Sequence, residues 1–304
     1  MSKPLVTLVT SSAFPELDEG EKGLPEALEA RGIDVDLKQW DDPSVNWADA
    51  GVCVLRSVHN YAADRAKFLE WAHTVPRLLN NANIIEWNTD KHYLQELNSR
   101  GMPVIDTVWL EPERRLSKHQ VHTRFPAHGD FVVKPAVSSG SRQAGRYTAN
   151  DAISRMNAIQ HAYGLLKQER AVMVQRYVDS VDVRGETALI YLNGVLSHTV
   201  EKQAMLRGED ASPGSVAPER VFARDATIEE LRVGERARAA IHGYIKDRMG
   251  RDAQLLFCRI DIVEGEDGAP TVMEVSLTDA SLYCGTVPGA LDSFADAIAS
   301  RVFW

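Results

Sequence analysis

Short apolar runs and helical spacing alternate through roughly the first ninety residues of the chain. An apolar run from Leu5 to Thr10 ends at two serines and predicts a buried strand. Helical spacing follows at about 21–31, strand patterns occupy 35–37 and 51–56, and a second helical pattern covers about 64–73. This β-α-β-β-α order is typical of a small α/β lobe with a mostly parallel sheet.

Three polar residues lie at or just past the end of the 51–56 strand pattern. They are Arg56, Ser57 and His59. Ligands of open α/β sheets bind beyond the carboxyl ends of the strands, so these side chains are candidates for ligand contact. For His59, a surface histidine that caps a turn is an alternative interpretation.

The pattern changes after residue 90. A helix is expected at about 91–100. The segment 131–178 then contains a strand, a loop rich in glycine and serine, a second strand, a helix and a third strand. The rest is rich in strand patterns, at 187–192, 195–200, 256–263 and 271–275, with helical patterns at about 227–249 and 290–301.

These changes predict a mixed α/β chain in three parts. We expect an N-terminal α/β domain at 1–88, a central lobe at 89–178 and a C-terminal lobe at 179–304. The stretch from Glu209 to Pro218 is rich in turn-forming residues and is expected to be a mobile loop.

Composition narrows the classes of protein to consider. A chain of 304 residues with 44% hydrophobic content can bury the cores of two or three lobes. The formal net charge of −9 disfavours nucleic acid as the main partner. No apolar run approaches the ~18 residues of a membrane span, and the N-terminus lacks the pattern of a signal peptide.

The three cysteines are far apart in the sequence. Cys53, Cys258 and Cys284 form no Cys-x-x-Cys pair and are expected to be buried thiols. Such thiols suit a reducing compartment, so we expect a cytoplasmic protein.

Lys134 ends an apolar strand pattern and precedes a small, flexible loop. A lysine at a strand end presents a compact charge that suits phosphate oxygens. In the loop, backbone N–H groups and hydroxyls can close over phosphates, and the residues concerned are Ser138, Ser139, Gly140 and Ser141. A surface lysine followed by an ordinary hairpin turn is the competing interpretation.

The strand pattern at 172–178 leads into a turn. A strand of this kind can offer backbone groups to the edge of an adenine. Asp182 follows and could accept protons from ribose hydroxyls, and Arg184 would project on the same face if the segment is extended. A solvated loop is the alternative for Asp182.

The sharpest pattern lies near the C-terminus. Arg259 and Asp261 alternate on an apolar strand and so share one face. Glu274 sits thirteen residues beyond Asp261 in a second apolar strand, with a hairpin signal at 266–268 between them. Two adjacent buried carboxylates repel unless a cation lies between them, and carboxylate oxygens suit Mg²⁺. A buried salt bridge with Arg259 is the structural alternative.

As a set, these motifs resemble those of ATP-grasp ligases such as the D-alanine–D-alanine ligases. The resemblance covers roughly residues 85–304 and rests on the order of the lysine, the Gly/Ser loop, the hinge strand and the acidic hairpin. It implies the ATP-grasp fold, with ATP and Mg²⁺ as cofactors. Asp261 and Glu274 would then ligate Mg²⁺, and Arg259 would stabilise the charge of a phosphorylated intermediate.

The same resemblance implies the nucleotide contacts. Lys91, Lys134 and Lys202 would contact ATP, Lys202 through its phosphates. Asp182 would hold the ribose. The adenine hinge would comprise Gln175, Arg176, Tyr177 and Val178.

One position departs from the family pattern. ATP-grasp ligases usually have Asn two residues after the metal-binding Glu, and this chain has Ser276. Either Ser276 holds one metal more loosely, or Asp279 supplies the missing oxygen.

The segment from Val54 to Tyr61 resembles a less common branch of the superfamily. That branch includes a cyclo-ligase that closes O-ureido-D-serine to D-cycloserine, and in it Arg56, Ser57 and His59 would face an amino-acid-like substrate. The expected activity is therefore formation of a carbon–nitrogen bond, with ADP released, in antibiotic biosynthesis.

Two other functions stay open at this stage: an intermolecular amino-acid or dipeptide ligase, and an ATP-binding regulatory module without turnover. A dinucleotide-binding dehydrogenase is disfavoured, because no Gly-x-Gly-x-x-Gly follows the first strand. The expected partner is a small amino-acid-like molecule, and the sequence leaves open whether the chain forms a homodimer.

Overall fold

A computed structural model describes residues 3–206, 218–250 and 254–303 of the chain. Its N-terminal sheet has the order β2-β1-β3-β4, and all of its strand pairs are parallel, as the sequence predicted. The strands are β1 (Leu5–Thr10), β2 (Asp34–Gln39), β3 (Val52–Leu55) and β4 (Leu78–Leu79). The helices of this part are α1 (Leu24–Glu29), α2 (Arg65–Thr74) and α3 (Ala82–Asn88).

Two features of this part differ from the sequence prediction. Helix α1 is shorter than expected, because Glu19–Glu21 forms a separate 3-10 turn and Pro25 stands in the first turn of the helix. Helix α3 was not predicted. Its first turn is capped by Asn81, whose side chain accepts a hydrogen bond from the Ile84 N–H.

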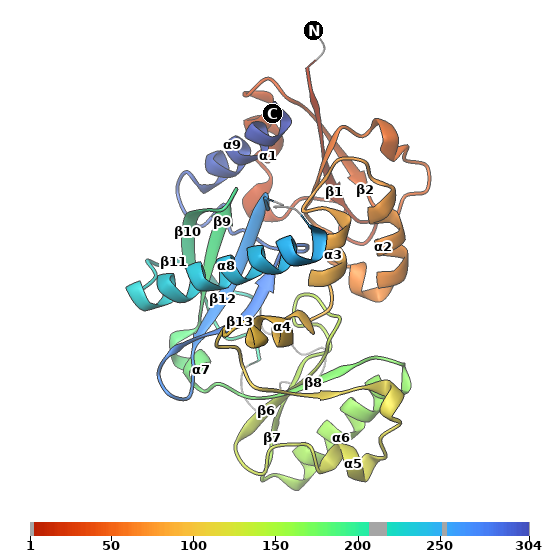
Figure 1. Cartoon of the computed structure of the whole chain (residues 1–304), viewed down its shortest axis with the longest axis vertical. Helices are drawn as coiled ribbons and strands as arrows, with labels where there is room; N and C mark the ends of the chain where they lie inside the picture. The colour runs from red at the N-terminus through yellow and green to blue at the C-terminus, as the bar shows by residue number, and fades with distance from the viewer. Residues whose placement is uncertain (1–2, 207–217, 251–253, 304) are drawn as a thin grey trace.

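The central sheet is antiparallel, with the order β5-β8-β6-β7. Helices α5 (Lys118–His122) and α6 (Ala152–Lys167) pack against it, and this part lies at one end of the molecule (Figure 1). Its strands are β5 (Thr107–Leu110), β6 (Asp130–Pro135), β7 (Gly145–Thr148) and β8 (Val172–Arg176), and α4 (Tyr93–Ser99) precedes them.

The third sheet is also antiparallel, with the order β11-β10-β9-β12-β13. Its strands are β9 (Glu186–Leu192), β10 (Val195–Lys202), β11 (Val221–Ala223), β12 (Phe257–Glu264) and β13 (Pro270–Ser276). The long helix α8 (Ile228–Met249) crosses this sheet (Figure 1). A capping box of Thr227 and Glu230 begins α8, and Gly250 in the left-handed conformation ends it.

The last helix, α9 (Ala290–Val302), returns to the N-terminal part and packs against α1 (Figure 1). Arg31 Nε lies 2.6 Å from Asp296 Oδ1, which ties the two elements together. One hydrophobic cluster contains residues of both the first and the third sheet, among them Leu8 and Ile190. The N-terminal and C-terminal parts therefore share a core. The central sheet has a cluster of its own, and Met173 of β8 also belongs to a cluster with residues of the third sheet.

Residues 180–184 correct one local prediction. This segment forms a short helix, α7 (Ser180–Arg184), instead of extended chain, so Asp182 and Arg184 do not project on one face as strand residues would. Residues 209–217 of the predicted loop at 209–218 lie outside the described residues.

Two general expectations can also be compared with the structure. The three cysteines are free and buried, as predicted. Within the described ranges, no helix is long and apolar enough to cross a bilayer.

Candidate active site

The acidic pair of the C-terminal hairpin lies in register. Asp261 in β12 is the direct partner of Glu274 in β13, next to an irregularity that follows Asp261. Gly268 adopts φ of 79° in the connecting turn, a conformation that favours glycine. The predicted hairpin pairing is confirmed, and it places the two carboxylates on neighbouring strands. Glu274 lines the main cavity, whereas Asp261 is buried and is not among the residues that line it.

Arg259 lies two residues before Asp261 and shares its face of the sheet. One terminal nitrogen, Nη2, lies 3.0 Å from Asp261 Oδ2 and 3.2 Å from Ser276 Oγ. The other, Nη1, donates to the Ser281 carbonyl at 3.1 Å and to the Tyr283 hydroxyl at 3.3 Å. This planar fork is held from both sides, so the guanidinium is fixed in position before any ligand binds.

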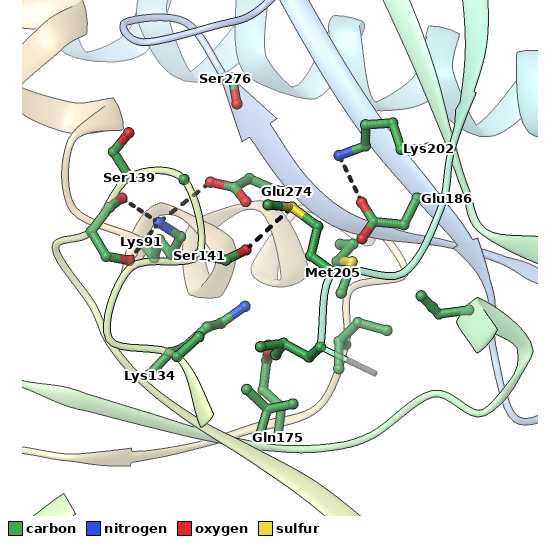
Figure 2. A pocket seen from close by; sticks show the side chains of 18 of the residues that line it. Lys91, Lys134, Ser139, Ser141, Gln175, Glu186, Lys202, Met205, Glu274 and Ser276 are labelled. Carbon is green, nitrogen blue, oxygen red and sulfur yellow. Dashed lines mark hydrogen bonds and ion pairs between the residues drawn. The ribbon is translucent and has the colours of Figure 1, made fainter. Parts of the chain in front are cut away.

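Lys202 at the end of β10 lies between the carboxylates of Glu186 and Asp261, and Figure 2 shows its contact with Glu186. Its Nζ is 2.7 Å from Glu186 Oε2 and 2.7 Å from Asp261 Oδ2. Burial disfavours the charged amine, but the charges of Asp261 and Glu186 outweigh it and raise the pKa of Lys202 well above its usual value. The lysine therefore neutralises part of the acidic site in this structure.

The second oxygen of Asp261 has no such partner. Its Oδ1 atom is buried, and among the described residues it accepts no hydrogen bond. A buried oxygen of this kind is costly unless a cation or a donor reaches it. No group of three or more His, Cys, Asp and Glu side chains in the described ranges is arranged to hold a metal.

Lys91 and Lys134 approach Glu274 from the opposite side of the cavity (Figure 2). Lys91 Nζ is 3.3 Å from Glu274 Oε1 and donates to the Ser138 carbonyl at 2.9 Å. Burial would raise the pKa of Glu274, but the charges of Lys91 and Lys134 foremost lower it to about 2. For Lys134, burial disfavours the charged amine and lowers the pKa to about 8.

The loop after β6 forms one wall of this cavity. Gly140 and Ser141 both have positive φ, of 60° and 55°, which turns the loop sharply. Ser139 Oγ donates to Asp279 Oδ2, and Ser141 Oγ lies 3.8 Å from Met205 Sδ. The predicted loop residues Ser138, Ser139, Gly140 and Ser141 all line the cavity, together with Lys91 and Lys134.

The predicted hinge residues Gln175, Arg176, Tyr177 and Val178 line the same cavity. The Tyr177 N–H already donates to the Asp130 carbonyl at 2.9 Å. Asp182 accepts hydrogen bonds from the Tyr177 hydroxyl at 2.6 Å and from Arg146 at 2.8 Å. Arg184 pairs with Glu264, and its side chain is 68% exposed, away from the cavity.

Arg56 and Ser57 are buried, and neither side chain is exposed at the surface of a pocket. The Arg56 side chain is 1% exposed, pairs with Glu21 and donates to the Ala280 carbonyl at 3.1 Å. Ser57 is buried. Of the three residues expected to face a substrate, His59 alone lines pockets described here, and it lies between Asp18 and Asp279.

A second, acidic pocket adjoins the main cavity. Asp18, Glu19, Glu21, Ser281 and Tyr283 line it, and Glu219 lines both pockets. The Tyr283 hydroxyl donates to Glu219 Oε1 at 3.0 Å and accepts from Arg259, so it stands at the border between the two. Glu186, Glu219 and Tyr283 were not predicted as site residues, because none belongs to a spaced pattern in the sequence.

Comparisons with known proteins identify the family of the chain. Residues 6–80 match the family described as D-cycloserine synthetase DcsG, N-terminal domain. The chain is 33% identical over 306 residues to the cycloserine biosynthesis protein DcsG of Streptomyces lavendulae, covering 98% of this chain and 99% of that protein.

Solved structures give the same result. The crystal structure of D-cycloserine synthetase DcsG superposes with a TM-score of 0.85 at 32% identity, covering 98% of this chain and 99% of that one. The D-alanine–D-alanine ligase from Bacillus anthracis superposes with a TM-score of 0.64 at 15% identity, covering 98% of each chain, which shows the shared ATP-grasp fold. The chain therefore belongs to the DcsG family of ATP-grasp ligases, which are enzymes that form carbon–nitrogen bonds.

Proposed function

We propose that this chain is an ATP-dependent cyclo-ligase that closes O-ureido-D-serine to D-cycloserine. The observation that carries the proposal is the acidic hairpin pair of Asp261 and Glu274, surrounded by Arg259, Lys91 and Lys202, in a chain of the DcsG family. Opposite charges are concentrated in one cavity, which suits a polyanion together with a divalent cation.

In this reaction the serine carboxylate takes the γ-phosphoryl group of ATP, and ADP leaves. The nitrogen bonded to the side-chain oxygen then attacks the activated carbonyl carbon, and phosphate leaves. One water molecule then hydrolyses the bond between that nitrogen and the carbamoyl group. The ring nitrogen keeps a hydrogen, and the carbamoyl group leaves as carbon dioxide and ammonia. Ring closure is favoured since both reacting groups belong to one molecule.

The nucleotide phosphates are proposed to lie between the loop 138–141 and the three lysines. Lys91, Lys134 and Lys202 would each contribute a positive charge to the transferring phosphoryl group. The adenine is proposed to lie against the 175–178 segment. Because the Tyr177 N–H is already bonded to Asp130, the backbone groups of Arg176 and Val178 would make the adenine contact.

The donor set fits Mg²⁺. The buried Oδ1 of Asp261 accepts no hydrogen bond within the described residues, and Glu274 is its strand partner. Asp261 and Glu274 would hold the ion, with nucleotide oxygens and water as its other ligands. When bound, Mg²⁺ would neutralise charge on the phosphoryl group during transfer.

Ser276 is the weaker candidate for a metal ligand. Its hydroxyl already accepts a hydrogen bond from Arg259. Asp279 is the alternative ligand: its Oδ2 accepts a hydrogen bond from Ser139, and its Oδ1 lies 2.7 Å from His59 Nδ1 but accepts no hydrogen bond among the described residues. Arg259 would stabilise the negative charge that develops on the activated carboxylate.

The acidic pocket is proposed to receive the amino group of the substrate. An ammonium group suits a surface that carries Asp18, Glu19 and Glu219. Because Glu219 and Tyr283 border the main cavity, the carboxylate of the same molecule could reach Arg259.

The test combines ATP, Mg²⁺ and O-ureido-D-serine, and follows phosphate release and product mass. Ring closure adds no second molecule to the product, whereas an intermolecular ligase would give a heavier one. Asp261→Asn should lower turnover by at least about 100-fold. Asp247→Asn is the matched control, because Asp247 is an exposed partner of Arg100 far along the surface helix α8. Near-normal turnover of Asp261→Asn would refute the proposed role of this carboxylate.

A further inference from the structure

His59 lies where three parts of the chain meet. Its Nε2 is 3.1 Å from Asp18 Oδ1, in the loop after β1. Its Nδ1 is 2.7 Å from Asp279 Oδ1, in the segment after β13. The other oxygen of Asp279 accepts a hydrogen bond from Ser139, in the loop after β6. One imidazole thus connects the N-terminal part, the C-terminal part and the loop that forms one wall of the main cavity.

Neighbouring contacts reinforce this connection. The His59 carbonyl accepts a hydrogen bond from Arg142 Nη1 at 2.5 Å, and the Tyr61 hydroxyl donates to the Ser138 carbonyl at 3.2 Å. The segment 59–61 therefore contacts the loop at both ends. Because Gly140 and Ser141 have positive φ, the loop between these contacts has a defined, tightly turned path.

The link between the carboxylates is ionic. Burial disfavours the imidazolium, but hydrogen bonds and charges from Asp18 and Asp279 outweigh it and raise the pKa of His59 to about 10. A charged His59 carries a proton on both ring nitrogens. Its Nε2 is hydrogen-bonded to Asp18, and its Nδ1 forms an ion pair with Asp279 Oδ1.

The two carboxylates face different pockets. Asp18 lines the acidic pocket, whereas Asp279 and Ser139 line the main cavity. An ammonium group beside Asp18 would neutralise part of the negative charge of this carboxylate. His59 would then interact more strongly with Asp279, and Asp279 is the residue that holds Ser139.

We propose that His59 is a positioning residue that couples the acidic pocket to the loop 138–141, so that an amino-acid ligand beside Asp18 tightens nucleotide binding. The inference rests on the proposed function for the identity of the two ligands. It assigns His59 a role through Asp18, Asp279 and Ser139, in place of the direct substrate contact expected from the sequence.

The experiment measures the affinity of a non-hydrolysable ATP analogue with Mg²⁺ by calorimetry, with and without O-ureido-D-serine. In the wild type, the amino acid should tighten analogue binding by at least about fivefold. In His59→Gln, which cannot carry the charge, the factor should fall below about twofold. His73→Gln is the matched control, because His73 is an exposed histidine 3.6 Å from Glu86, and it should keep the full factor.

A second variant separates loss of coupling from misfolding of His59→Gln. Ser139→Ala breaks the same chain of contacts from the loop side and should also lose the coupling. An uncoupled wild type, or full coupling in either His59→Gln or Ser139→Ala, would overturn the inference. Absence of product from a wild type that binds both ligands in a coupled way would instead refute the proposed reaction and leave this inference intact.

Discussion

Replacing Lys202 by methionine keeps most of the side-chain volume and removes the charge between Glu186 and Asp261. Both carboxylate oxygens lie 2.7 Å from the same Nζ, so they are at most twice that distance apart. At about 5 Å and an effective dielectric constant of about 20, two such charges repel by roughly 3 kcal/mol. Arg259 still neutralises part of Asp261, at 3.0 Å from its Oδ2.

Removing one partner from a buried ion pair typically costs about 3–5 kcal/mol. Because of Arg259, we expect Lys202→Met to lower the free energy of unfolding by about 3 kcal/mol, at the lower end of that range. Urea unfolding without nucleotide measures it. Lys3→Met is the matched control: Lys3 and Asp34 are more than half exposed and 3.8 Å apart, so its effect should stay below about 0.5 kcal/mol.

Magnesium provides a second measurement on the same variant. In the wild type, the charge of Lys202 already neutralises part of the charge of Asp261, so Mg²⁺ alone gains little there. When the lysine charge is removed, Mg²⁺ alone should stabilise Lys202→Met but leave the wild type nearly unchanged. If the variant unfolds at the wild-type urea concentration, or if Mg²⁺ affects both proteins equally, the view that Lys202 neutralises the acidic site is wrong.

Three further predictions follow from other positions. Burial lowers the pKa of Lys134 to about 8, so the lysine loses its charge as pH rises from 7 to 9. Nucleotide affinity, measured by calorimetry, should fall over this range, and Lys134→Arg should remove the dependence. A flat wild-type profile would contradict this prediction. A Cβ on Gly185, at φ of 69°, would lie 2.3 Å from the Lys202 carbonyl oxygen. Gly185→Ala should therefore lower the free energy of unfolding by at least about 2 kcal/mol, whereas Gly32→Ala, also at positive φ but in open space, should cost about 1 kcal/mol; equal losses would argue against the clash. Ser276→Asn offers a longer amide oxygen and should lower the Mg²⁺ concentration for half-maximal phosphate release several-fold, and an unchanged value would exclude this position as a ligand.

The acidic hairpin could be predicted because two local rules combine there. Alternation places Arg259 and Asp261 on one face of a strand, and the turn signal at 266–268 fixes which residue of the next strand lies opposite. The spacing between Asp261 and Glu274 therefore indicates, from one sequence alone, that the two side chains lie on paired positions of the hairpin.

Other parts of the site depend on contacts between distant segments. Glu186 begins a strand and looks like a solvated residue until the antiparallel pairing of β9 with β10 brings it opposite Lys202. Arg56 was expected to face a ligand, but its partner Glu21 lies in a 3-10 turn thirty-five residues away, with no periodic signal to indicate the pair. The helix at 180–184 is too short, at five residues, for helical spacing to reveal it.

The packing of α9 against α1 has a consequence for how ligands reach the buried site. Since the first and third sheets share one hydrophobic core, they should move together as a single rigid body. The central sheet has a cluster of its own and contacts the third sheet through Met173, so it would move as a second body. Its connections near Ile105 and Val178 are where it would rotate. We expect ATP to be admitted, and ADP to be released, through rotation of that central part.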